Sequence, residues 1–296
     1  MNIDIYPQFR ELNIGDAAVF NRAFKDNSPT ISEFTFTNLY SWRWAYSLRV
    51  SLFDGLIILC SESESRKRFF TPIGKGDIRA AAEKILKDKG GIFFRLPGET
   101  IVLFAEDNRF LIEPDRDNWD YLYSASDLLN LPGKKYDGKR NLIMKFKSGQ
   151  AYEYITLNAE NAASCLDFEE AWCSLKDCDK VKALSQEKRA IKDMVENFSF
   201  FGLTAAAIQI NGVIRAFVIA QELSPDTMVI HIFKADPNIA GLYQTMLQEF
   251  IWRAGVTRFR YVNMEQDLGI EGLRKAKLSY HPCSMVNKYA LSLAEQ

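Results

Sequence analysis

Histidine is scarce in this 296-residue sequence, and cysteine shows no paired motif. Only His231 and His281 are present, so a histidine-rich metal centre is excluded. The five cysteines are odd in number and form no Cys-x-x-Cys motif, which argues against a disulfide framework and against a zinc site. We therefore expect no bound metal and a reducing, cytoplasmic environment.

The sequence also lacks a strong net charge and a long apolar run. Its formal net charge is -1 and its pI is about 6.2, so the chain as a whole has no field that would draw it to nucleic acid or to an anionic membrane. No apolar run reaches membrane-spanning length, and the first residues show no basic region followed by an apolar segment. We expect a soluble protein without a transmembrane segment or a targeting peptide.

The chain is long enough for two domains, and one order of elements occurs twice in it. Asp54-Gly55 and Asn211-Gly212 each separate two apolar or alternating runs, which predicts two β-hairpins. Each hairpin is followed by a strand that ends at a proline, Pro72 or Pro237, then by an amphipathic helix and a further strand. This internal repeat predicts an α/β fold with two similar domains of mixed sheets.

The most polar stretch follows the last strand of the second repeat. Residues around Tyr261 predict a short buried strand, and Asn263, Glu265 and Asp267 follow at its carboxyl end, where α/β sheets commonly place their chemistry. A helix over residues 268–278 is expected next, with basic side chains near its C-terminal end. These basic residues are Arg274, Lys275 and Lys277.

Two interpretations of this stretch are open. Asp267 can cap the helix and the cations can complete it, in which case the stretch is structural. Three carboxylates and three cations in so short a span exceed what helix capping requires, which favours a functional interpretation. An individual pair such as Asp267 with Arg274 can still be a salt bridge that fixes the loop.

Residues 134–147 form a locally basic segment, with six basic residues against one acid. A solvated helix face explains most such runs. The alternative is contact with the phosphates of a nucleic acid or of a lipid head group, which requires a local excess of charge when the whole chain is neutral. Lys139, Arg140 and Asn141 are the candidate binding residues here.

Four motifs together resemble a known family. They are the segment from Asn263 to Pro282, the segment from Lys135 to Asn141, Glu187 in its helix, and His231-Ile-Phe-Lys234 at a strand end. On these motifs the chain resembles the phosphatidylglycerol lysyltransferase C-terminal domain family, whose members are similar to the Fem-type aminoacyl transferases. The resemblance, with the repeated order of elements, implies two tandem GNAT-like acyltransferase domains. We place them at residues 1–140 and 141–296, with the active site in the second.

The resemblance implies acyl transfer, in which an amine attacks an activated carbonyl through a tetrahedral oxyanion. The chain lacks the multi-helix membrane region that accompanies the lipid-modifying enzymes, so the acceptor is left open among amines, lipids and small molecules. Such chemistry needs a base for the amine proton, donors for the oxyanion and cations for phosphates. The candidate catalytic residues are Asn263, Glu265, Asp267 and Tyr280. The candidate substrate-binding residues are Lys234, His231, Arg274 and Lys277, with Lys139, Arg140 and Asn141.

The acyl donor is also open at this point. The family implies aminoacyl-tRNA, and the partners implied are tRNA and an anionic lipid head group. Ordinary GNAT enzymes instead hold acyl-coenzyme A with a Gln/Arg-x-x-Gly-x-Gly/Ala loop, which residues 236–241 match only at Gly241, while Asp236 would repel a pyrophosphate. Residues 71–76 have better glycines but lack the basic or amide first residue. A third interpretation is a non-catalytic binding module on the same fold.

Overall fold

A computed structural model describes residues 3–62, 67–176 and 182–294 of the chain. The chain forms two units, and neither is continuous in sequence. Unit 1 consists of Met1–Tyr121, Gln266–Arg274 and Met285–Gln296, and unit 2 consists of Leu122–Glu265 and Lys275–Ser284. The division that we expected between residues 140 and 141 falls inside a helix of unit 2 that spans Asp137–Gly149.

Unit 1 is built on a mixed sheet. Its strands are β1 (Arg10–Glu11), β2 (Leu48–Phe53), β3 (Leu56–Glu62), β4 (Lys67–Phe69), β5 (Ile73–Gly74), β6 (Ile92–Pro97), β7 (Phe110–Pro114) and β15 (Lys288–Leu293). They lie in the order β1-β2-β3-β4-β6-β15-β7, with β5 paired to β3. β2 and β3 form the hairpin predicted at Asp54-Gly55, where both turn residues have the positive φ that a type I′ turn requires.

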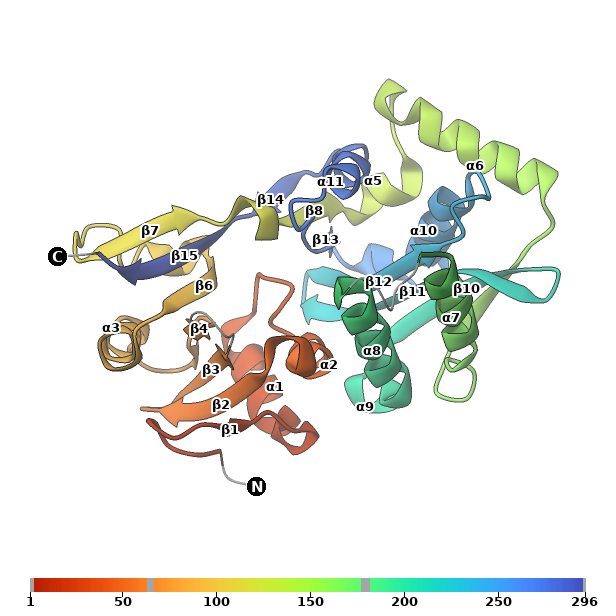
Figure 1. Cartoon of the computed structure of the whole chain (residues 1–296). Coiled ribbons are helices and arrows are strands. Elements are labelled where there is room, and N and C mark those ends of the chain that lie inside the picture. Colours follow the sequence, from red (N-terminus) through yellow and green to blue (C-terminus); the bar gives the residue numbers. More distant parts are fainter. Residues whose placement is uncertain (1–2, 63–66, 177–181, 295–296) are drawn as a thin grey trace. The chain divides into compact units, whose positions relative to one another are not determined.

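The helices of unit 1 surround this sheet (Figure 1). They are α1 (Ala17–Asn27), α2 (Phe36–Tyr46), α3 (Ile78–Lys89) and α4 (Gly98–Ile101). Asp77 caps α3 by accepting a hydrogen bond from the Ala80 amide at 2.9 Å. The buried face of α3, which includes Ala81 and Ile85, packs with Phe69 and Phe93 of the sheet in one hydrophobic core.

The second sheet is mixed as well. Its strands are β8 (Asp120–Ser124), β9 (Glu153–Leu157), β10 (Thr204–Ile210), β11 (Val213–Ser224), β12 (Thr227–Ala235), β13 (Tyr261–Asn263) and β14 (Ser284–Val286). They lie in the order β14-β8-β13-β12-β11-β10-β9, with β12 and β13 parallel. The hairpin predicted at Asn211-Gly212 joins β10 and β11, again with positive φ at both turn residues.

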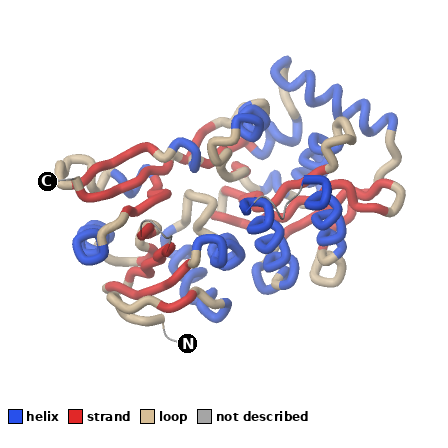
Figure 2. The backbone as a smooth tube through the Cα atoms, viewed as in Figure 1, coloured by secondary structure: helices blue, strands red, loops and turns tan. Residues whose placement is uncertain are grey.

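Helices pack on both faces of this second sheet (Figures 1 and 2). The remaining helices are α5 (Ala125–Asn130), α6 (Asp137–Gly149), α7 (Ser164–Lys176), α8 (Lys182–Glu196), α9 (Phe198–Phe201), α10 (Leu242–Arg253) and α11 (Glu271–Leu278). Successive side chains of a strand point to opposite faces. Ala205 and Ala207 of β10 therefore pack with α7 and α8, whereas Ala206 and Ile208 face the side on which α10 lies.

The predicted repeat is confirmed. In unit 1 the hairpin β2–β3 is followed by β4, α3 and β6, and in unit 2 the hairpin β10–β11 is followed by β12, α10 and β13. The chain is thus a mixed α/β protein in which this order of elements occurs twice. No helix within residues 3–62, 67–176 and 182–294 is both long enough and apolar enough to cross a bilayer.

Candidate functional site

The two parallel strands of unit 2 separate where the predicted polar stretch begins. Their last paired residues are Val229 and Asn263, and residues 230–235 of β12 extend beyond the end of β13. The chain turns away at Glu265, which has a φ of 58°. A positive φ is uncommon for a residue with a side chain, so the turn is held by its surroundings.

Glu265 and His231 meet at this divergence. The Glu265 carboxylate lies 2.9 Å from Nδ1 of His231, and the other ring nitrogen, Nε2, lies 3.2 Å from the side-chain oxygen of Gln221. The histidine side chain is 1% exposed and the glutamate side chain 18% exposed. The imidazole is thus fixed from both sides, and it orients a carboxylate that solvent reaches in part.

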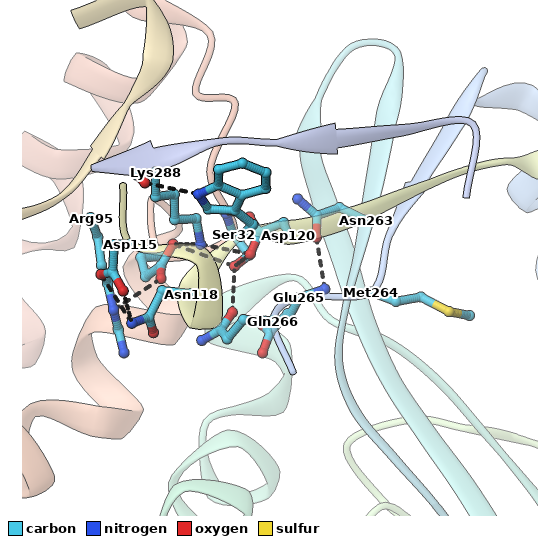
Figure 3. A network of polar contacts seen from close by, with 12 residues as sticks. Ser32, Arg95, Asp115, Asn118, Asp120, Asn263, Met264, Glu265, Gln266 and Lys288 are labelled. Atoms are coloured by element: carbon cyan, nitrogen blue, oxygen red, sulfur yellow. Dashed lines mark hydrogen bonds and ion pairs between the residues drawn. The ribbon is translucent and has the colours of Figure 1, made fainter. Parts of the chain in front are cut away.

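Asn263 and Lys277 hold the segment that carries this glutamate. The Asn263 side-chain oxygen accepts a hydrogen bond from the Glu265 amide at 2.8 Å (Figure 3), and the Lys277 ammonium donates to the Met264 carbonyl oxygen. Asn263 is fully buried. Both contacts are made to the peptide group between Met264 and Glu265, so these two side chains fix the backbone from which the Glu265 carboxylate extends.

Tyr280 follows α11 and brings a buried hydroxyl to unit 2. The residue is 5% exposed, and its hydroxyl has no hydrogen-bond partner within the described part of the chain. Burial raises the pKa of this phenol well above its usual value, so that it stays protonated. The Lys139 ammonium lies 3.9 Å from the Tyr280 ring centroid and donates to the Ser279 hydroxyl at 2.8 Å.

The aromatic pair Phe233 and Tyr243 was not among the predicted residues. Phe233 lies next to Lys234 on β12 and faces the opposite side of the sheet from it, while Tyr243 lies in the first turn of α10. Their rings stack with centroids 3.9 Å apart, and the Tyr243 ring lies 6.5 Å from that of Tyr280. The alternation of β12, combined with the helix that follows it, could have indicated this pair from the sequence.

Lys234 lies on the face of β12 that α7 and α8 cover, and because a β-bulge interrupts the strand at His231, the spacing of the two residues does not place them on opposite faces. Its ammonium contacts Glu169 at 2.8 Å and Glu187 at 2.7 Å, and it lies 3.9 Å from the Trp172 ring centroid. Lys234 and Glu169 are both buried. This ammonium is held by two carboxylates and a tryptophan, so the structure does not place it as a phosphate ligand.

Asp267 and Arg274 form an ion pair within unit 1. The Arg274 guanidinium donates to both carboxylate oxygens of Asp267 at 2.9 Å, and Arg116 and the Tyr121 hydroxyl donate to the same carboxylate at 3.2 and 2.5 Å. Burial alone raises the pKa of the Asp267 carboxyl, but hydrogen bonds from Arg274, Tyr121 and the Gly269 amide outweigh burial and hold the pKa well below its usual range. A saturated carboxylate of this kind is a poor base.

The basic segment 134–147 lies largely in α6. Arg140 is turned onto its own loop, where it donates to the carbonyl oxygens of Leu131 and, at 2.9 Å, Gly133. Asn141 is exposed. The segment thus mixes two paired cations, Arg140 and Lys147, with the exposed Lys134, Lys135 and Lys145, since the Lys147 ammonium lies 2.5 Å from the buried Glu249 carboxylate.

The N-terminus of α10 is occupied by protein. Gly241, its N-cap, has a φ of 85°, and a Cβ atom at this position would lie 2.3 Å from the Leu142 carbonyl oxygen of α6. In unit 1 the start of α3 is already capped by Asp77, and a Cβ atom at Gly76 would lie 2.8 Å from Leu56. These glycines serve close packing, and neither helix start resembles an open pyrophosphate site.

Unit 1 has a different arrangement at the equivalent place. Its parallel strands are last paired at Phe69 and Phe93, and the residue with positive φ two positions later is Arg95. Arg95 lies 3.4 Å from Glu33, and the buried Lys288 contacts Glu33 at 2.6 Å. Lys288 also contacts Asp120 at 2.6 Å (Figure 3). A buried network of two cations and two carboxylates thus stands where unit 2 has a partly exposed glutamate.

Within the described ranges, no three histidine, cysteine, aspartate or glutamate side chains come together in a way that could hold a metal ion.

Comparisons with known proteins identify the family. The family model described as phosphatidylglycerol lysyltransferase, C-terminal, matches residues 25–292. No curated protein sequence matches the chain. A conserved protein of unknown function from Bacteroides thetaiotaomicron is 32% identical, with a TM-score of 0.88 over 97% of this chain and 99% of that one.

Two more distant structures share the fold. L-PGS from Bacillus licheniformis is 13% identical, with a TM-score of 0.67 over 100% of this chain and 95% of that one. FemX is 8% identical, with a TM-score of 0.58 over 97% of each chain. The matched model spans most of the sequence, and the chain therefore belongs to the family of phosphatidylglycerol lysyltransferase C-terminal domains.

Proposed function

We propose that this protein transfers an aminoacyl group from aminoacyl-tRNA to an amine or to a lipid or other small-molecule acceptor, and that the β12–β13 divergence of unit 2 is the catalytic site. The observation that carries the proposal is the pairing of Glu265 with His231 beyond the last parallel strand pair. A partly exposed carboxylate, oriented by a fixed imidazole, is suited to accept a proton.

In the proposed reaction the acceptor amine attacks the ester carbonyl carbon of the donor. The new C–N bond forms while the carbonyl electron pair moves to oxygen, and the C–O bond to the tRNA ribose breaks when the intermediate collapses. Glu265 takes the proton that the amine loses. Tyr280, protonated and without a partner within the described residues, gives a proton to the departing ribose oxygen. A hydroxyl acceptor follows the same steps and forms a C–O bond.

The other predicted residues have supporting roles in this proposal. Asn263 and Lys277 hold the peptide group between Met264 and Glu265, and the Lys277 ammonium supplies positive charge near the developing oxyanion. Lys139 and the exposed Lys134, Lys135 and Lys145 meet donor or acceptor phosphates. Asp267, Arg274, Lys234 and Arg140 are assigned structural contacts instead.

An acyl-coenzyme A donor is the alternative, and the helix termini argue against it. In unit 2 the start of α10 is covered by α6 at Leu142, and Asp236 lies just before that helix. A pyrophosphate there would meet a carbonyl oxygen and a carboxylate rather than open N–H groups. We therefore expect coenzyme A to bind weakly to unit 2.

The test offers the purified protein two labelled donors in parallel, aminoacyl-tRNA and acetyl-coenzyme A, each with and without amine acceptors and anionic lipid vesicles. The proposal expects label to leave the tRNA in an acceptor-dependent way. Transfer only from acetyl-coenzyme A would establish the alternative donor. No transfer from either donor, with intact folding, would favour the non-catalytic binding module.

A further inference from the structure

Unit 1 contains a cavity that the proposed reaction does not use. It has a volume of about 210 Å³ and lies beside the end of β4, near the start of α3 and the segment after β6. Much of its lining is apolar, with Phe24, Phe34, Pro72 and Ile73 among the residues around it. Engineered apolar cavities of about 150 Å³ take up benzene, so this one is large enough for a molecule of several carbon atoms.

One wall of the cavity carries an unusual polar group. Thr71 is 4% exposed, and its hydroxyl has no hydrogen-bond partner within the described residues. Leaving a buried hydroxyl unpaired costs free energy, because its bonds to water are lost and not replaced. A ligand in the cavity that forms a hydrogen bond with the Thr71 hydroxyl would remove this cost.

Thr71 of unit 1 occupies the position in the fold that His231 occupies in unit 2. Phe69 is the last residue of β4 that pairs with β6, and Thr71 lies two residues after it. In the same way, Val229 is the last residue of β12 that pairs with β13, and His231 lies two residues after it. Nδ1 of His231 is paired with the Glu265 carboxylate. In unit 1 the residue equivalent to Glu265 is Arg95, which binds the Tyr46 hydroxyl and approaches Glu33 instead.

One of the residues that line the cavity is negatively charged. Glu99 is exposed and lines the cavity, and its carboxylate accepts a hydrogen bond from the Thr30 hydroxyl at 2.6 Å. A fixed negative charge at the entrance disfavours anions. The interior can therefore accept an apolar group with one oxygen that bonds to Thr71, provided that the molecule is not a carboxylate.

We propose that unit 1 has a second ligand site, in which Thr71 donates a hydrogen bond to the carbonyl oxygen of a short neutral acyl compound such as a branched carboxamide. The alkyl part of the ligand packs against Phe24, Phe34 and Ile73. The site is independent of the aminoacyl transfer proposed for unit 2, because its cavity is lined by unit 1 residues alone.

The test uses isovaleramide as the probe and the methyl resonances of Ile73 and Ile78, which line the cavity, as the readout in the full-length protein. Saturable shifts of both methyl groups are expected. Thr71→Val has nearly the same shape without the hydroxyl, and it should weaken binding about tenfold without lowering the thermal midpoint. Isovalerate, which carries a carboxylate, should bind more weakly than the amide.

Thr245→Val is the matched control. Thr245 is also fully buried with a hydroxyl that has no partner within the described residues, but it lies in α10 of unit 2. This variant should bind isovaleramide as the wild type does. Absence of a saturable shift, or equal affinity of Thr71→Val and wild type, would overturn the site, and equal binding of isovalerate would overturn its preference for neutral ligands.

Discussion

Glu265 and Arg95 occupy equivalent positions, two residues beyond the last parallel pair of their sheets, and both have a positive φ. Arg95 is buried in an ion network, whereas the Glu265 side chain is partly exposed and lies against His231. The same backbone turn therefore carries a buried, ion-paired arginine in unit 1 and a partly exposed glutamate in unit 2. In the proposed reaction, the side chain at this position decides which unit offers a base to a substrate.

Asp267 tests the structural role of the ion pair. Its folded pKa is depressed, so its contribution to stability is complete above the ordinary aspartate pKa of about 4 and is lost as the pH falls further. Asp267→Asn should lower the free energy of unfolding at neutral pH by about 2–3 kcal/mol. Between about pH 5 and about pH 3 the variant should lose less stability than the wild type does. Denaturant titrations across this range measure both effects, and parallel pH profiles would disprove the pairing.

The substitution Tyr280→Phe distinguishes a catalytic role of Tyr280 from a structural one. Its hydroxyl has no partner within the described residues, so Tyr280→Phe should leave the thermal midpoint unchanged or slightly higher. If the phenol protonates the leaving oxygen, the same change should slow aminoacyl transfer about tenfold or more. The control is Tyr261→Phe, on the neighbouring β13. A fall in the midpoint that matches the loss of rate would assign Tyr280 to packing alone.

At the scale of elements, the close packing of α6 against the start of α10 is the feature that separates unit 2 from an open pyrophosphate site. Gly241→Ala places a Cβ atom on the Leu142 carbonyl oxygen in addition to straining a φ of 85°, and should cost about 3 kcal/mol of stability. Gly255→Ala strains a similar φ with nothing within 4 Å and should cost about 1 kcal/mol. Equal costs in thermal or denaturant unfolding would mean that α6 does not pack as described.

The sequence predicts those elements that rest on local signals. The two hairpins follow from Asp54-Gly55 and Asn211-Gly212, whose residue types adopt the positive φ of a type I′ turn, and the repeat follows from their spacing. Simple alternation along β12 does not give the face on which His231 lies, because a β-bulge interrupts the strand at that residue. Side-chain pairs such as Asp267 with Arg274 could only be stated as alternatives, because charge pattern alone does not distinguish an ion pair from a reactive group.

At the scale of the whole molecule, strand order is what the sequence could not indicate. β15, from the C-terminal end of the described chain, lies between β6 and β7, and β8, from the first half, lies between β13 and β14. Pairing between strands so far apart in sequence leaves no local signal. A division of the chain at one point, such as residue 140, therefore does not reproduce the two units.

Truncation tests this strand order. A chain that ends at Asn287 lacks β15 and loses the buried residues Lys288 and Leu291, so unit 1 should not fold. A chain that ends at Leu293 retains β15 and should behave as the full protein does. Hydrogen exchange on both chains would show the difference as loss of amide protection in β6 and β7. Protected amides in those strands without β15 would contradict the sheet order.

The central claim is that unit 2 transfers an aminoacyl group with Glu265 as the base. The most direct measurement is the single-turnover rate of transfer from saturating labelled aminoacyl-tRNA, compared between Glu265→Gln and Glu222→Gln. Glu222 is an exposed carboxylate on β11 of the same sheet, so its loss controls for charge. The account predicts that Glu265→Gln slows transfer about 100-fold or more with unchanged tRNA binding, and that Glu222→Gln leaves the rate unchanged. Equal rates for both variants and the wild type would contradict it.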